Sequence, residues 1–177
     1  MKKNWRKIII QPADMKPFQH SHTNQPQRTN RVRVTKEFNF EIAHALWNYD
    51  GLCKNIHGHS YKLFVTVTGT PLNQPDHPKN GMLIDFGDLK KIIEKTVVEP
   101  LDHAVILNAR SFSDNLKAVD QMFDKRFIVD YQPTCENMVI DIASRISAKL
   151  PEGITLHSVK LHETGSSFAE WYAADNA

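Results

Sequence analysis

An alternation of apolar and polar side chains with a two-residue period runs through most of two stretches of this chain, residues 33–44 and 60–69. In a β-strand, residues two apart point to the same face of the sheet. The apolar faces would carry Phe38, Phe40 and Ile42 in the first stretch and Tyr61, Leu63, Val65 and Val67 in the second. The alternation therefore predicts two strands that each bury one face.

Three histidines keep the apolar parity of these stretches. His44 ends the first strand, while His57 and His59 come immediately before Tyr61 in the second. An imidazole on an apolar face is costly unless its nitrogens are occupied, and a metal would occupy them. Three neutral imidazoles with an open fourth position are typical of catalytic zinc. The sequence therefore predicts a metal site at these histidines if the two strands pair, with Gly58 leaving the opposite face bare.

Cys53 leaves two interpretations of this site open. It lies in the loop before His57, close to the turn signal Asp50-Gly51. As a fourth ligand, the thiolate would close a structural His₃Cys site. As a separate group, it would be a reactive thiolate beside the metal. The spacing does not decide between them.

Two acidic positions are further candidates. Asp102 is adjacent to His103, and a carboxylate beside an imidazole can orient it as a base–orienter pair does, although a surface His beside a loop Asp is the ordinary alternative. Glu163 stands where a predicted strand ends in Thr-Gly-Ser, which can expose a carboxylate to a pocket. A solvated glutamate explains that position equally well.

Two helices are predicted from apolar residues at helical spacing. The first begins near residue 85 and is expected to end at Pro100. The second begins after Thr134, which is a suitable N-cap. Glu136 and Asn137 lie in its first turn, and capping alone explains their residue types.

The order of the elements predicts the fold class. Two strands precede the helices, and two more, about 155–162 and 167–172, follow them. Residues 70–81 hold three prolines and are expected to form a loop, and residues 127–130 are a possible short strand within a long connection. The predicted fold is α+β, in the order β-β-α-α-β-β, with a four-stranded antiparallel sheet and two helices on one face.

Composition limits the class of protein further. A chain of 177 residues suits one domain, and its net charge of +2, without basic runs interleaved with aromatics, does not predict a nucleic-acid partner. The apolar run Ile8–Ile10 is too short for a membrane span, and two cysteines make no disulfide framework, so a cytoplasmic location is expected. Residues 1–30 are expected to be a flexible N-terminal extension and residues 31–177 a single catalytic domain.

Six motifs then occur in order along the chain. They are Phe38–His44, Cys53-x₃-His57-Gly58-His59-x-Tyr61, Met82–Lys90, Leu101-Asp102-His103, Pro133-Thr134-x-Glu136-Asn137 and Glu163-Thr164. Together they resemble the 6-pyruvoyltetrahydropterin synthase/6-carboxytetrahydropterin synthase family across about residues 32–173. The resemblance implies the tunnelling fold (T-fold), in which subunits join edge to edge into a barrel and two trimers stack into a homohexamer.

The resemblance also implies roles for the candidate residues. His44, His57 and His59 would hold one zinc ion per subunit, and Cys53 would be the catalytic base rather than a ligand. Asp102 and His103 would complete a relay with Cys53 from a neighbouring subunit. Glu163 would anchor a pterin ring by its amino-pyrimidine edge. Thr134, Glu136 and Asn137 would line the substrate pocket.

The implied activity is that of a zinc-dependent lyase. It would convert 7,8-dihydroneopterin triphosphate to 6-carboxy-5,6,7,8-tetrahydropterin with release of acetaldehyde and triphosphate, in queuosine (7-deazapurine) precursor biosynthesis. The three residues between Cys53 and His57 are typical of the carboxy-type enzymes. Two alternatives stay open: a 6-pyruvoyltetrahydropterin synthase, and a non-catalytic structural zinc module.

Overall fold

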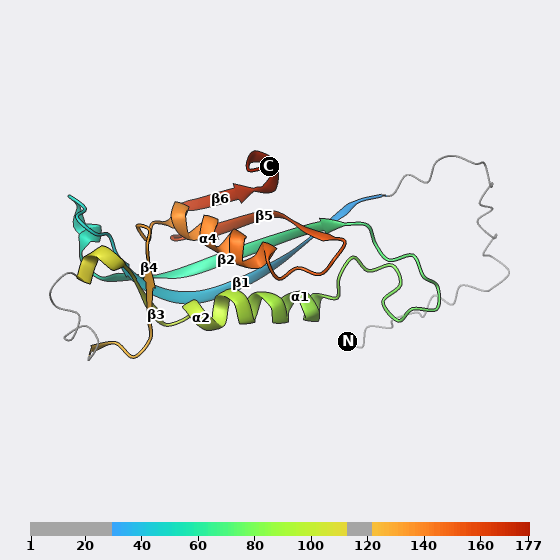
Figure 1. Ribbon diagram of the computed structural model, residues 1–177, viewed down its shortest axis with the longest axis horizontal. Helices are drawn as coiled ribbons and strands as arrows, with labels where there is room; N and C mark the ends of the chain where they lie inside the picture. The colour runs from blue at the N-terminus through green and yellow to red at the C-terminus, as the bar shows by residue number, and fades with distance from the viewer. Residues whose placement is uncertain (1–29, 113–121) are drawn as a thin grey trace, which may run out of the picture.

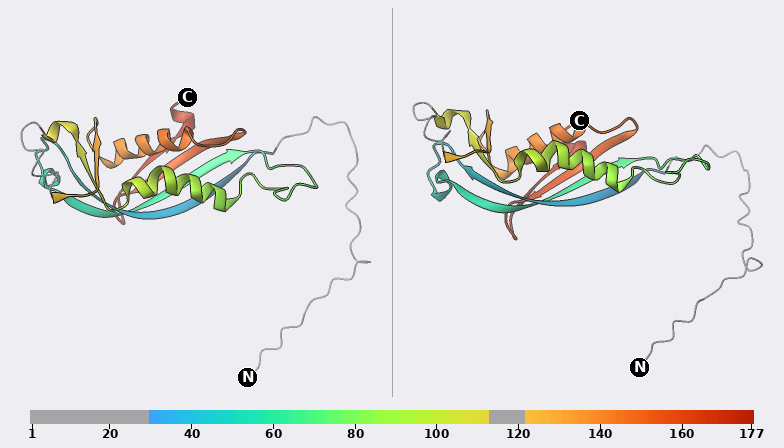
Figure 2. Two further views of the ribbon diagram at one scale, coloured as in Figure 1. Left: turned by 60° about the horizontal axis from the view of Figure 1, so that its bottom comes forward. Right: turned by 90° about the horizontal axis from the view of Figure 1, so that it is seen from below.

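The protein forms one curved β-sheet with helices on one face. The computed structural model describes residues 30–112 and 122–177, so residues 1–29 of the predicted N-terminal extension lie outside the described residues. Figure 1 shows long central strands flanked by shorter ones, and both views in Figure 2 place helices α1 and α4 on the same side of the sheet. The α+β class and the one-sided helical layer are therefore confirmed.

The sheet has six strands in the order β4-β3-β1-β2-β5-β6. Their bounds are β1 Val32–Ala45, β2 His57–Gly69, β3 Ala104–Asn108, β4 Arg126–Val129, β5 Ile154–His162 and β6 Phe168–Tyr172. Strands β1, β2, β5 and β6 pair antiparallel, whereas β3 pairs parallel with both β1 and β4.

The prediction of a four-stranded antiparallel sheet is wrong in both number and direction. The additional strand β3 has the sequence Ala-Val-Ile-Leu-Asn, and all five of its residues are buried. A strand that is covered on both faces has no apolar–polar alternation, so the two-residue period cannot reveal it. The short segment expected at residues 127–130 is strand β4, which extends the sheet beyond β3.

The first helical segment agrees with its predicted bounds to within one residue at each end. Helix α1 (Phe86–Ile93) begins after Asp85, whose side chain accepts hydrogen bonds from two backbone N–H groups, and it continues through a π-helical turn (Glu94–Val98) into α2 (Glu99–Leu101). The last helical residue is Leu101, so the helix ends one residue after Pro100, close to the predicted end. Pro100 itself lies in the first turn of α2, where a residue without an N–H group is tolerated.

Helix α4 (Cys135–Ser147) follows its sequence signals closely. The Thr134 hydroxyl accepts a hydrogen bond from the Asn137 N–H at 3.4 Å, which confirms the predicted N-cap. Its buried stripe includes Met138, Ile142 and Ile146.

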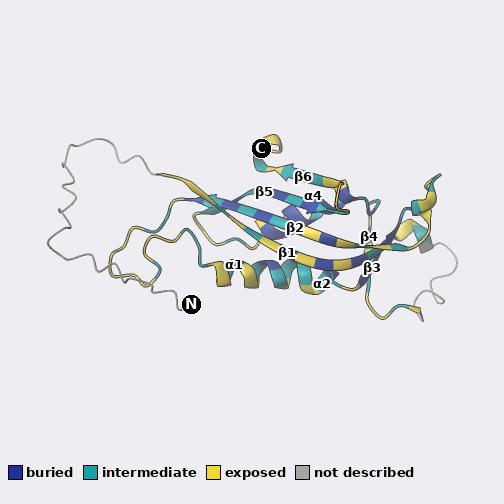
Figure 3. Cartoon of the chain, turned by 180° about the vertical axis from the view of Figure 1, so that it is seen from behind, coloured by how far each residue is buried: buried dark blue, intermediate teal, exposed yellow. Residues whose placement is uncertain are grey.

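The hydrophobic core lies between the helices and the sheet, and the inward-facing side chains of both form it. Along β1 and β2 buried and exposed residues alternate, as Figure 3 shows, and Tyr61, Leu63, Val65 and Val67 are fully buried. Burying one such side chain contributes about 1.5–3 kcal/mol relative to exposing it. Within residues 30–112 and 122–177, no helix is both long enough and apolar enough to cross a membrane.

Candidate active site

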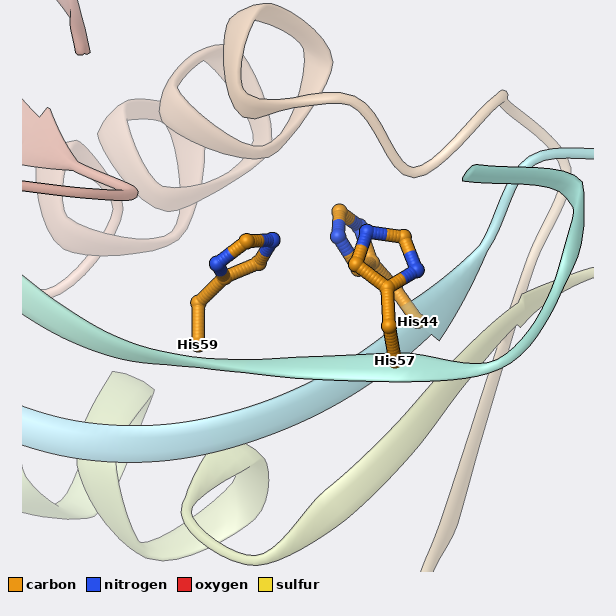
Figure 4. A group of neighbouring side chains, drawn as sticks. All are labelled: His44, His57 and His59. Carbon is orange, nitrogen blue, oxygen red and sulfur yellow. The ribbon is translucent and has the colours of Figure 1, made fainter. Parts of the chain in front are cut away.

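The pairing of β1 with β2 brings the three predicted histidines together. His44 lies directly opposite His57, and Ile42 lies opposite His59, so the three rings rise from one face of the two strands (Figure 4). Their potential ligand nitrogens all lie within 4.8 Å of one another. The ring centroid of His44 is 4.6 Å from that of His57 and 5.4 Å from that of His59. A single metal ion has room to contact all three imidazoles.

Backbone carbonyls orient two of these rings. Nδ1 of His44 lies 2.7 Å from the carbonyl oxygen of Pro133, and Nδ1 of His57 lies 2.9 Å from that of Asn55. A carbonyl oxygen only accepts hydrogen bonds, so both Nδ1 atoms must carry the proton. The Nε2 lone pairs are thereby left for another partner, which is the usual arrangement around metal-bound histidines.

The environment of His44 fits a metal ligand. The side chain is only 3% exposed, and its Nε2 is buried without a hydrogen-bond partner among the described residues. Burial lowers the pKa of His44, against the opposing effect of the Pro133 carbonyl, and keeps the imidazole neutral. An unpaired buried nitrogen is costly, and coordination to a metal would remove that cost.

The histidines open into a pocket of about 450 Å³. Its walls also include Cys53, Thr134, Glu136 and Glu163, all of which are predicted site residues. Sequence reasoning missed five further lining residues, because they belong to no pattern that marks a site: Leu46, Tyr49, Cys135, Ser167 and Phe168. Asn137 is not part of the lining. Its side chain donates a hydrogen bond to the carbonyl of Gln132 at 2.9 Å.

The two cysteines near this pocket differ in their surroundings. Cys53 lies in a 3₁₀ turn (Leu52–Lys54) and is partly exposed. Its Sγ does not belong to the group of potential ligand atoms that His44, His57 and His59 form. Cys135 is buried, and its Sγ lies 3.3 Å from the carbonyl of Leu161. Burial raises the pKa of Cys135 to about 11, so this thiol stays protonated at neutral pH. Cys53 is therefore the more available thiol in the pocket.

Glu163 follows the end of β5 and is held from inside the protein. The hydroxyl of Tyr61 donates a hydrogen bond to Oε1 of Glu163 at 3.1 Å, and Nε2 of His44 lies 3.7 Å from the same oxygen. The Glu163 side chain is 25% exposed. The sequence indicated that Tyr61 shares a face with His59 but not that it contacts Glu163.

Asp102 and His103 form the expected contact, but on the other face of the sheet. The Asp102 carboxylate accepts a hydrogen bond from the Glu41 N–H at 2.9 Å and lies 2.9 Å from Nδ1 of His103. The Glu41 N–H, and then His103, hold the pKa of Asp102 below its ordinary value. His103 lines a hollow of about 320 Å³ with Gly58 and Ser60, whose strand parity is opposite to that of His57 and His59, although His59 also borders this hollow. Within one chain, His103 and Cys53 line different hollows.

Comparison with known proteins identifies the family to which this sequence is similar. The family described as 6-pyruvoyl tetrahydropterin synthase matches residues 33–174. The chain belongs to this family. The "6-carboxy-5,6,7,8-tetrahydropterin synthase" of Haemophilus influenzae is 36% identical over 141 residues, which cover 78% of this chain and 97% of that protein.

Two further proteins with similar names have lower sequence identity to this chain. The human "6-pyruvoyl tetrahydrobiopterin synthase" is 30% identical over 152 residues, covering 79% of this chain and 90% of its own. The structure of the Caenorhabditis elegans 6-pyruvoyl tetrahydropterin synthase matches with a TM-score of 0.58 at 21% identity, over 82% of this chain and 98% of that one. The latter supports the fold alone. Membership of the 6-pyruvoyl tetrahydropterin synthase family therefore rests on the sequence match, and the fold agrees with it.

The Gln132 side chain connects the segment before helix α4 to the loop that carries Cys53. Its side-chain amide accepts a hydrogen bond from the Trp47 N–H at 2.9 Å and donates one to the Trp47 carbonyl at 2.7 Å. The next residue, Pro133, contacts His44 through its carbonyl, and Thr134 caps α4. One short segment thus contacts His44 of the histidine cluster, the N-terminus of helix α4 and the loop that carries Cys53.

Proposed function

We propose that this protein is a zinc-dependent lyase that converts 7,8-dihydroneopterin triphosphate to 6-carboxy-5,6,7,8-tetrahydropterin, releasing acetaldehyde and triphosphate. The observation that carries the proposal is the convergence of three imidazole nitrogens in a pocket that also contains Cys53 and Glu163. The name of the Haemophilus influenzae relative supports the same reaction. The proposed pathway is the synthesis of a queuosine (7-deazapurine) precursor, and the proposed location is the cytoplasm.

The three histidines would hold the metal through Nε2 of His44 and His57 and one ring nitrogen of His59. A neutral nitrogen donor set with no acidic or thiolate member suits zinc. A bound zinc ion would supply Lewis acidity toward the hydroxyl groups of the substrate side chain. The protein's own contribution is to keep the His44 imidazole neutral by burial and to orient the His44 and His57 rings through the carbonyls of Pro133 and Asn55.

Cys53 is the proposed base that removes a carbon-bound proton from the substrate. His103 would take part in the same proton transfer. Asp102 would orient the imidazole ring of His103 and stabilise the positive charge that this ring gains. Because His103 lines a different hollow from Cys53, we infer that a neighbouring subunit supplies the Asp102–His103 pair. Edge-to-edge assembly of residues 31–177 as a single T-fold domain, into trimers and a hexamer of two trimers, would bring the two faces together.

Glu163 is the proposed anchor of the pterin ring. An ionised carboxylate has only acceptor oxygens, and the amino-pyrimidine edge of a pterin offers two adjacent N–H donors. Thr134 and Glu136 border the same pocket, so they are proposed to limit the ring's position. Asn137 is proposed to act indirectly, by securing Gln132 and the start of α4.

The choice of product is tested by one assay. Incubation of the zinc-loaded protein with 7,8-dihydroneopterin triphosphate should release acetaldehyde and triphosphate in equal amounts. Release of triphosphate without acetaldehyde would instead indicate a 6-pyruvoyltetrahydropterin synthase, the alternative that the human relative favours. The carboxy-type reaction is preferred because three residues separate Cys53 from His57 and because the Haemophilus influenzae relative is the more similar of the two.

X-ray absorption on the metallated protein addresses the remaining alternative, a structural zinc module closed by Cys53. We expect nitrogen and oxygen scatterers only, since the group of converging ligand atoms comes from His44, His57 and His59 and does not include Cys53. A sulfur scatterer at bonding distance in the resting protein would contradict the base role.

A further inference from the structure

Tyr61 occupies a position between the metal-site histidines and Glu163. It lies in β2, two residues after His59, and is 0% exposed. Its ring stacks on Phe40 with a centroid separation of 6.0 Å and meets the rings of His44 and His59 edge-on at 6.3 and 5.9 Å. The ring is therefore immobilised by packing, and its hydroxyl has a set direction.

That hydroxyl makes one contact that bears on the pocket. It donates to Oε1 of Glu163 at 3.1 Å across 102 residues of sequence. A carboxylate can only accept, so the direction of the hydrogen bond is unambiguous. The Glu163 side chain is one-quarter exposed and borders the pocket, so without this donor its rotatable bonds would let the carboxylate turn toward solvent.

We propose that Tyr61 is a positioning residue that holds the Glu163 carboxylate in the orientation needed to accept both donors of the ligand's amino-pyrimidine edge. Each carboxylate oxygen has two lone pairs, so Oε1 can accept from Tyr61 and from the ligand together. This inference rests on the proposed function, because it specifies how the proposed pterin anchor is fixed. Tyr61 itself neither contacts the reacting atoms nor ligates the metal.

The inference predicts a defined kinetic pattern. An anchor remote from the reacting bonds holds substrate and transition state alike, so weakening it should raise KM while kcat changes little. Tyr61→Phe removes only the hydroxyl and keeps the ring that packs on Phe40. Loss of a hydrogen bond to a charged group predicts pterin binding weaker by about tenfold or more. The zinc content should be unchanged.

Tyr131→Phe is a matched control for this substitution. Its hydroxyl also donates to a carboxylate, that of Asp141 at 2.9 Å, and burial raises its pKa in the same direction as that of Tyr61. Neither Tyr131 nor Asp141 lines the pocket. This variant loses the same kind of bond and should bind pterin as the wild type does.

The experiment titrates zinc-loaded full-length protein with neopterin and follows the ligand's fluorescence. If the wild type fails to bind neopterin, the proposed pterin site is wrong and the inference falls with it. If the wild type binds and Tyr61→Phe binds equally well, only the inference is overturned. Glu163→Asp tests the same contact from the other side, since it keeps the charge but shortens the reach, and it should also weaken binding.

A double-mutant cycle separates positioning from a general structural effect. If Tyr61 acts through Glu163, adding Tyr61→Phe to Glu163→Gln should weaken neopterin binding far less than it does alone. An equal loss in both backgrounds would show that Tyr61 supports the pocket by packing and would overturn the inference.

Discussion

Removing one imidazole from the metal site should separate stabilisation by metal from stabilisation by protein contacts. His57→Ala is the most informative substitution because His57 is only partly buried and its ring donates a hydrogen bond to the carbonyl of Asn55 in an exposed setting. The metal-free variant should therefore lose no more than about 1 kcal/mol of unfolding free energy. His44, in contrast, is buried, and its replacement would also leave a cavity.

The expected metal effect is larger than that loss. A ligand that binds only the folded state, at a free concentration one hundred times its Kd, stabilises by about 2.7 kcal/mol. For a chain of this size, that corresponds to a rise in Tm of about 5 to 10 °C. The ligand nitrogens come from two paired strands and converge only when β1 and β2 are assembled, so the unfolded chain should bind zinc far more weakly.

Thermal melts with and without buffered zinc, and again after addition of chelator, test this reasoning. The wild type should show the full shift, His57→Ala should lose most of it, and His77→Ala should behave as the wild type. His77 is a suitable control because it lies in the loop of residues 70–81 and is absent from the cluster of ligand atoms. A full wild-type shift in His57→Ala, or no shift in the wild type, would refute the three-histidine site.

Three further predictions concern Cys53, Asp102 and Gln132. Cys53→Ala should retain zinc by elemental analysis but lose turnover in the acetaldehyde assay, and loss of zinc would count against its role as a base. Asp102 has a folded-state pKa below its ordinary value of 3.8, so it stabilises the protein above that pH, and this contribution is lost as the pH falls through the folded value. The unfolding free energy of Asp102→Asn, measured by denaturant titration, should therefore fall less than that of the wild type as the pH is lowered from about 5 to 2. An equal fall in both proteins would contradict the contact with the Glu41 N–H. Gln132→Ala removes both hydrogen bonds to the Trp47 backbone and should lower stability by about 1 kcal/mol; it should lower kcat with zinc retained, whereas unchanged kcat would show that this clasp does not position the Cys53 loop.

Local patterns in the chain were sufficient for the two central strands and the histidine cluster. Residues of one parity in a strand must share a face, so His44, His57 and His59 could be assigned to the apolar side of β1 and β2 before any contact was known. The start of α4 at Thr134 was equally predictable, because capping depends on residues three positions apart. These features follow from backbone geometry over a few residues.

Features that depend on contacts between distant segments could not be read in this way. Strand β3 was missed because a strand buried on both faces loses its alternation, and its parallel pairing with β1 requires a long crossover. The contact of Tyr61 with Glu163 spans 102 residues and exists only because β2 pairs with β5. Likewise, Asp102 and His103 were recognisable as a pair in the sequence, but their place on the face opposite the metal site follows from the paths of β1, β2 and β3 through the sheet. Side-chain parity is a local property of the chain, whereas the choice of neighbouring strand is set by burial of the whole core.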